Sequence, residues 1–233
     1  MRCVWEHNGS DTLLYSVDHI GAYTRGESLA VAIEKMHAEI ELYSLWAKQP
    51  HIPMAEFEIV QEKNSNLQIA DADSDVLFHS EAAPLSQQEY ESLKELVLKS
   101  AQDFHNLYSS IPNKHKSHLP IRKTFYGNVP RTAQEMYDHT KNVNSYYFGE
   151  IGIEADNDET IYSCRKRAFE LLEQTDGFLS NPVVEGSYGE LWSLRKVLRR
   201  FLWHDRIHAK AMYRMAVKTF DSHQISNPFH FSL

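Results

Sequence analysis

Two histidines one helical turn apart are the residues of this chain best suited to chemistry. His204 and His208 are separated by three residues, and a helix would place both imidazoles on one face. Two imidazole nitrogens on one face can bind a single metal ion, and His139, from an earlier helical segment, can supply a third. Three protein ligands leave coordination positions open, which is typical of catalytic rather than structural metal sites.

The residues around these histidines are those of a helical core. Apolar side chains recur every three or four positions in both segments: Leu194, Val197, Phe201, Met212 and Met215 in one, and Met136, Val143 and Tyr146 in the other. A buried imidazole needs partners for its nitrogens, and a shared metal ion would satisfy one on each ring. The alternative is that these are hydrogen-bonded core or rim residues, because a chain with 13 histidines contains some such pairs by chance.

Several charged residues are interpreted as solvent-facing. Asp205 points about 100° away from His204 on an ideal helix, so we expect it to be an exposed charge. The alternative is that its carboxylate contacts the metal-binding histidines without binding the metal itself. The basic clusters at 165–167 and 195–200 are interpreted as solvated helix faces. The C-terminal tail, with His230, is predicted to be mobile.

Composition sets limits on the class of protein. The 233 residues carry a net charge of −8, with 42% hydrophobic and 24% charged residues, as in ordinary globular proteins. The acidic balance disfavours binding to nucleic acid. The two cysteines, Cys3 and Cys164, form no disulfide framework, and no apolar run reaches the length of a membrane span. These features predict a cytoplasmic protein with no membrane partner.

The N-terminal part, 1–83, is predicted to be a small α+β domain. Short strands are expected at 13–17, 56–60 and 76–78, because these segments are apolar or alternate polar with apolar residues. A helix is expected from a cap at Ser28 to about Lys48, ending before Pro50.

The C-terminal part, 84–233, is predicted to be all-α. Four helices are expected at 86–110, 131–150, 158–175 and 187–220, with proline and glycine in the connections. Ser86 and Thr132 are each followed three residues later by a glutamate, the pattern of a capping box. Four such helices predict a four-helix bundle.

Two stretches of the helical part resemble a known family. EMYDHT at 135–140, followed by Val143 and the tyrosines 146–147, is similar to the second helix of the DinB/YfiT-like four-helix bundles. LRRFLWHDRIH at 198–208 is similar to their last helix. The resemblance covers about 85–220. It implies a divalent metal, zinc or nickel, held by His139, His204 and His208.

The same resemblance implies a class of reaction. Some relatives are metal-dependent transferases of small cellular thiols, and others are labelled hydrolases. We therefore expect a small-molecule substrate, with a low-molecular-weight thiol as one candidate, and a metal that activates either the thiol or water. Trp203, Tyr146 and Tyr147 are candidate pocket walls.

The N-terminal part resembles, over about 15–45, the HicB-like domains. A strand, a glycine-containing turn and an Ala/Glu-rich helix carry this resemblance. Such modules bind protein partners. The alternative function is therefore a non-catalytic stress-response or protein-interaction module, so the sequence leaves open whether the chain is an enzyme. Dimerisation of the bundle is compatible with either function.

Overall fold

The chain folds into two compact units. A computed structural model describes residues 1–50, 56–124, 127–220 and 222–232. Unit 1 comprises Met1–Pro84 and Asn181–Trp203, and unit 2 comprises Leu85–Ser180 and His204–Leu233. The fold is mixed α and β, as the sequence predicts. The last helix contributes to both units, because the division falls between Trp203 and His204.

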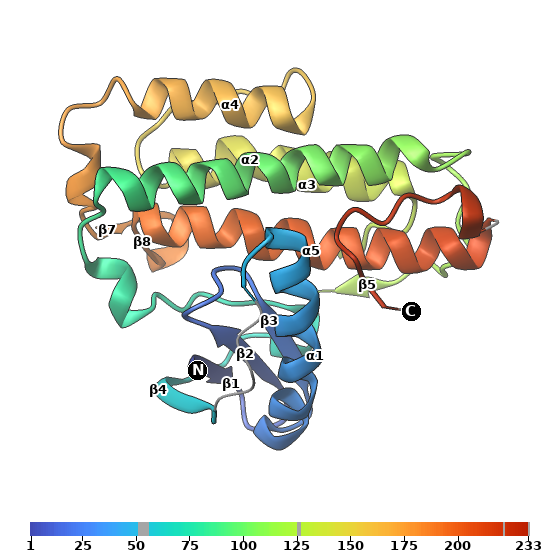
Figure 1. The fold of residues 1–233 in the computed structure, drawn as a ribbon, viewed down its shortest axis with the longest axis horizontal. Coiled ribbons are helices and arrows are strands. Elements are labelled where there is room, and N and C mark those ends of the chain that lie inside the picture. Colours follow the sequence, from blue (N-terminus) through green and yellow to red (C-terminus); the bar gives the residue numbers. More distant parts are fainter. Residues whose placement is uncertain (51–55, 125–126, 221, 233) are drawn as a thin grey trace. The chain divides into compact units, whose positions relative to one another are not determined.

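The order of elements along the chain is seen in Figure 1. Unit 1 contains β1 (Arg2–His7), β2 (Thr12–Ser16), β3 (Tyr23–Gly26), α1 (Leu29–Ala47), β4 (Glu58–Asn64), β7 (Val184–Glu185), β8 (Leu191–Trp192) and the start of α5 (Leu194–Thr219). Unit 2 contains α2 (Gln87–Ser110), β5 (Lys123–Thr124), β6 (Gly127–Asn128), α3 (Ala133–Gly149), α4 (Ile161–Leu172) and the rest of α5. Short 3₁₀ helices lie at Ile69–Asp71, His79–Ala82, Phe178–Ser180, Ser187–Gly189 and Ser222–Gln224.

A four-stranded sheet forms the centre of unit 1. Its order is β3-β2-β1-β4, with β4 parallel to β1 and the other pairs antiparallel. Because side chains alternate between the faces of a strand, the sheet has two different faces. On one face Thr24 donates a hydrogen bond from Oγ1 to the carbonyl of Ala32 in α1. On the other face Tyr15 and Tyr23 pack against Trp203 of α5, with ring centroids 5.9 and 6.1 Å apart.

The predicted strands and helix of this unit are found in part. The strands expected at 13–17 and 56–60 correspond to β2 and β4, each shifted by one or more residues. Residues 76–78 form no strand, although Val76 and Phe78 are buried. Ser28 caps α1 as predicted, accepting a hydrogen bond from the backbone N–H of Val31. β1 and β3 were not predicted.

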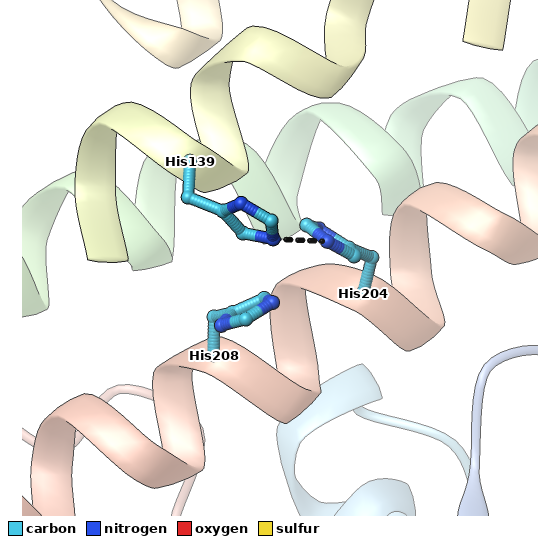
Figure 2. Close-up of side chains that lie close together, drawn as sticks. All are labelled: His139, His204 and His208. Carbon is cyan, nitrogen blue, oxygen red and sulfur yellow. Dashed lines mark hydrogen bonds between the residues drawn. The ribbon is translucent and has the colours of Figure 1, made fainter. Parts of the chain in front are cut away.

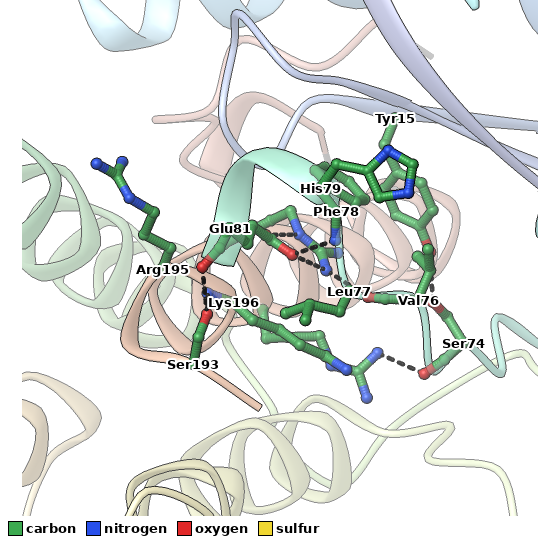
Figure 3. A network of polar contacts seen from close by, with 12 residues as sticks. Tyr15, Ser74, Val76, Leu77, Phe78, His79, Glu81, Ser193, Arg195 and Lys196 are labelled. Carbon is green, nitrogen blue, oxygen red and sulfur yellow. Dashed lines mark hydrogen bonds and ion pairs between the residues drawn. The ribbon is translucent and has the colours of Figure 1, made fainter. Parts of the chain in front are cut away.

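Glu81 explains why 181–203 group with the N-terminal unit (Figure 3). Its carbonyl accepts a hydrogen bond from Ser193 Oγ at 2.9 Å. The same carbonyl accepts a hydrogen bond from Asn181 Nδ2 at 2.8 Å, and the Glu81 carboxylate pairs with the Arg199 guanidinium. Arg195 donates to the carbonyls of residues 83 and 84. The structure thus divides the chain differently from the predicted 1–83 and 84–233, because these polar contacts hold the segment before α5 against unit 1.

Basic side chains predicted to be solvated are buried instead. Lys196, Arg199, Arg200 and Arg165 are each less than a tenth exposed. Each has an anionic partner, and Lys196 also donates to two backbone carbonyls. The interpretation as solvated faces was wrong for these four residues, because burial of a charged group is tolerated where it is paired and hydrogen-bonded.

The helices of unit 2 pack together as a group. α2, α3 and α4 contact one another, and α5 is joined to α3 by histidines and to α4 by an ion pair. Capping boxes begin α2 at Ser86 and α3 at Thr132, as predicted. The last helix begins at Leu194 rather than 187, because the residues before it form β8 and a 3₁₀ turn.

The described part of the C-terminal tail is packed rather than free. Phe229 is fully buried and Phe231 is 4% exposed, and their rings stack at 5.3 Å. Phe231 also lies over the Arg206 guanidinium, 5.4 Å from its ring centroid. The prediction of a mobile tail was wrong because the apolar side chains of the tail pack on unit 2.

No helix in the described part of the chain combines the length and apolarity needed to cross a membrane.

Candidate metal centre

The three predicted ligands come from two helices of unit 2. His139 lies near the middle of α3, whose first turn is fixed by the Thr132–Glu135 capping box. His204 and His208 lie one turn apart in the middle of α5. Buried methionines flank the histidines along each helix, Met136 on α3 and Met212 on α5. The predicted stripe is therefore buried next to the histidines at Met136 and Met212, whereas Val143 is half-buried and Tyr146 is exposed.

The structure brings the three imidazoles together, as Figure 2 shows. Nε2 of His204 lies 3.2 Å from Nε2 of His139. The His208 ring is 4.6 Å from that of His139 and 4.4 Å from that of His204, measured between centroids. One nitrogen from each ring lies within 4.8 Å of the other two. Among the described residues these three are the one group of this kind.

The spacing of the nitrogens fits a shared divalent ion. Two nitrogens bound to a tetrahedral zinc at about 2.0–2.1 Å are separated by about 3.3 Å. The His139–His204 separation of 3.2 Å is close to this value. The His208 nitrogen lies within 4.8 Å of these two. The donor set, three imidazoles, also suits nickel, copper and iron, so the residues define a site for a divalent metal but not its identity.

Burial keeps the imidazoles in the state that binds metals. It lowers the pKa of His139 below its usual value. It also lowers the pKa of His208 to about 3, with a smaller contribution from the neighbouring His139. A neutral imidazole has a free lone pair, whereas its protonated form has none. Both side chains are therefore ready to act as ligands at neutral pH without losing a proton.

The three histidines differ in how far they are exposed. His204 is buried at 8% exposure, whereas His139 and His208 are half-buried. The buried Tyr147 approaches His204 edge-on, with centroids 6.0 Å apart. Tyr147 therefore lies beside the cluster, and Tyr146, the next residue, is 38% exposed. A role for either as a pocket wall stays a prediction.

Two sequence interpretations near the site were wrong. Trp203, a candidate pocket wall, packs within unit 1 against Tyr15 and Tyr23. Asp205, expected to be exposed, is fully buried and receives two hydrogen bonds from Arg165 of α4, at 2.6 and 3.2 Å. The sequence contained one signal for this pair, an acidic residue among core positions of one helix and a basic residue at an equivalent place in another.

Comparisons with known proteins find no relative whose site could be compared with this cluster. No protein-family model matches the chain, and neither the curated proteins nor the solved structures show a significant match. The resemblance to the DinB/YfiT-like and HicB-like families therefore stays a prediction from the residues quoted above.

Proposed function

We propose that unit 2 is a four-helix bundle of the DinB/YfiT-like type that binds one divalent metal ion through His139, His204 and His208. In this proposal the protein is a metal-dependent enzyme that acts on a small electrophilic substrate. Two imidazole nitrogens at 3.2 Å, with a third ring in contact with both, are the observation that carries the proposal. The contacts among α2, α3, α4 and α5 support the bundle.

The chemistry follows from three neutral ligands. A divalent ion held by them keeps its positive charge and lowers the pKa of a thiol or water bound in an open position. His139 and His208 are more exposed than His204, and we expect a small molecule to reach the site past these two side chains. Tyr147 limits the space next to His204 on the buried side.

Metal content is the first test of this proposal. Protein purified without a histidine tag should contain about one divalent ion per chain. His139→Ala and His204→Ala should both lose it, because two imidazoles hold a divalent ion far less tightly than three. His105→Ala is the matched control, since His105 is a half-buried histidine of unit 2 that bonds to Tyr137 instead of the cluster. A wild-type protein without affinity for zinc, nickel or cobalt would reject the proposal.

A second experiment separates thiol from water activation. The protein is loaded with Co²⁺ and titrated with a small thiol. Direct binding of the thiolate produces a sulfur-to-cobalt charge-transfer band in the near ultraviolet, and this band should be absent from His204→Ala. If the band appears, thiol-transfer substrates are screened. If it does not appear, while the cobalt spectrum of the site responds to pH, water activation and hydrolysis are favoured.

A further inference from the structure

The buried ion pair between Arg165 and Asp205 connects α4 to the metal-binding stretch of α5. Both side chains are completely buried. Arg165 Nη1 donates to Asp205 Oδ2 at 2.6 Å, and Nη2 donates to Oδ1 at 3.2 Å. A guanidinium that meets a carboxylate with two nitrogens is restricted in orientation as well as in distance. The pair therefore restricts the rotation of α5 about its own axis as well as its distance from α4.

The position of Asp205 on α5 links the rotation of this helix to the direction in which His204 and His208 point. On an ideal helix His208 lies about 40° around the axis from His204, and Asp205 lies about 100° from His204. The histidines meet His139 of α3, and Asp205 meets Arg165 of α4. α5 is thus held on two adjoining sides within a single turn. Rotation about its axis would break the ion pair and move both histidines away from His139.

Stability alone is a weak reason for such a pair. Removing two charges from water carries a large penalty, and replacement of a buried pair by apolar residues of similar size is often neutral or stabilising. What apolar residues cannot reproduce is the directional, two-point contact. Groups that hydrogen-bond directly to metal ligands typically change metal affinity by 10–100-fold when they are altered, and a pair that sets the rotation of the ligand-bearing helix is expected to act at the lower end of this range.

We propose that Arg165 and Asp205 are positioning residues of the metal centre, which set the rotation of α5 so that His204 and His208 face His139. The inference rests on the proposed metal site. It adds that the affinity and coordination geometry of the site are controlled from the α4 side of the helix, by two residues that are not themselves ligands.

The test is a double substitution, Arg165→Met with Asp205→Leu, which removes both charges and leaves neither partner alone. The full chain is titrated with Co²⁺, and its visible ligand-field spectrum is recorded together with its unfolding in urea. We expect a folded protein whose Co²⁺ affinity is lower by roughly tenfold or more, with an altered ligand-field spectrum. Arg167→Met is the control, because Arg167 lies on the same helix and its ion pairs with Asp156 and Glu159 are at the surface.

The outcomes separate this inference from the proposal beneath it. A folded double variant with wild-type affinity and spectrum would overturn the positioning role while leaving the metal site intact. A wild-type chain that binds no metal would overturn both. If the double variant does not fold, Arg165→Lys decides: it keeps the charge but loses the two-point contact, and a wild-type spectrum in that variant would contradict the inference.

Discussion

Nε2 of His139 and Nε2 of His204 lie 3.2 Å apart although 65 residues separate them in the chain. Two neutral imidazoles can share one proton in a hydrogen bond at this distance, and they can equally bind one ion. The nearby His208 ring distinguishes the two arrangements. A hydrogen-bonded pair does not require a third imidazole in contact with both rings, whereas a metal site with open positions uses three ligands.

Metal should stabilise the native protein through this third histidine. A ligand that binds only the folded chain at 100 times its Kd adds about 2.7 kcal/mol to the free energy of unfolding. We expect zinc to raise the melting temperature of the wild type, measured by calorimetry after treatment with a chelator. His208→Ala should show little or no rise, and the control His105→Ala should behave as the wild type. An equal rise in the melting temperature of all three proteins would show that zinc binds at another site.

The sequence predicted the histidine cluster because its parts follow local rules. The spacing of His204 and His208 places them on one helical face, and the capping boxes at Ser86 and Thr132 mark where two helices begin. These signals depend on neighbours within a few residues. His139 was a candidate third ligand from its place in another helical segment, and the resemblance to a family made it the predicted one.

The features that were missed depend on contacts between distant segments. Lys196 and Arg199 were read as exposed because they are charged, yet both find acidic partners in unit 1. Arg165 and Asp205 are forty residues apart, and neither shows from its own neighbours that the other will neutralise it. β1 was missed because it is defined by its pairing with β2 and β4.

The buried Lys196 should give the protein a measurable pH dependence. Burial lowers the pKa of its ammonium group from 10.5 to about 8, against the opposing effect of Glu190. Between these two values the unfolded chain holds a proton that the native state has released. Unfolding then takes up a proton, so the contribution of Lys196 to stability rises with pH over this window.

The pH profile of a variant isolates this contribution. In urea unfolding from about pH 7.5 to 10.5, the difference in stability between wild type and Lys196→Met should move in favour of the wild type as pH rises. Lys166→Met, at the exposed position 166, controls for the loss of a lysine charge. A difference that stays constant across the range would show that Lys196 keeps its proton in the native state.

Gly21 should be much less tolerant of alanine than Gly9. Both have positive φ angles, +93° and +87°. A Cβ at Gly21 would lie 2.5 Å from Cβ of Leu202, whereas nothing lies within 4 Å of one at Gly9. Gly9→Ala should destabilise by about 1–2 kcal/mol through backbone strain, and Gly21→Ala by about 1–3 kcal/mol more through overpacking. Equal losses in denaturant unfolding would contradict the close packing of Gly21 on α5.

Substitutions at two neighbouring residues, one buried and one exposed, test whether the C-terminal tail packs on unit 2. Phe229→Ala removes a fully buried ring and should destabilise by about 3–5 kcal/mol. His230→Ala, at the exposed next position, should stay within about 0.5 kcal/mol of the wild type. Chemical unfolding of the two variants gives the comparison directly. A neutral Phe229→Ala would show that the tail does not contribute to unit 2.

The ligands of bound zinc show whether the three histidines form one metal site. X-ray absorption at the edge of zinc bound to the full chain measures the ligands and their distances without a substrate. We expect three imidazole nitrogens at about 2.0–2.1 Å, with the outer-shell scattering of histidine rings, and one or more oxygen or other non-histidine ligands in the open positions. Zinc bound by fewer than three imidazoles, or zinc whose spectrum is the same in His204→Ala, would contradict a site made by His139, His204 and His208.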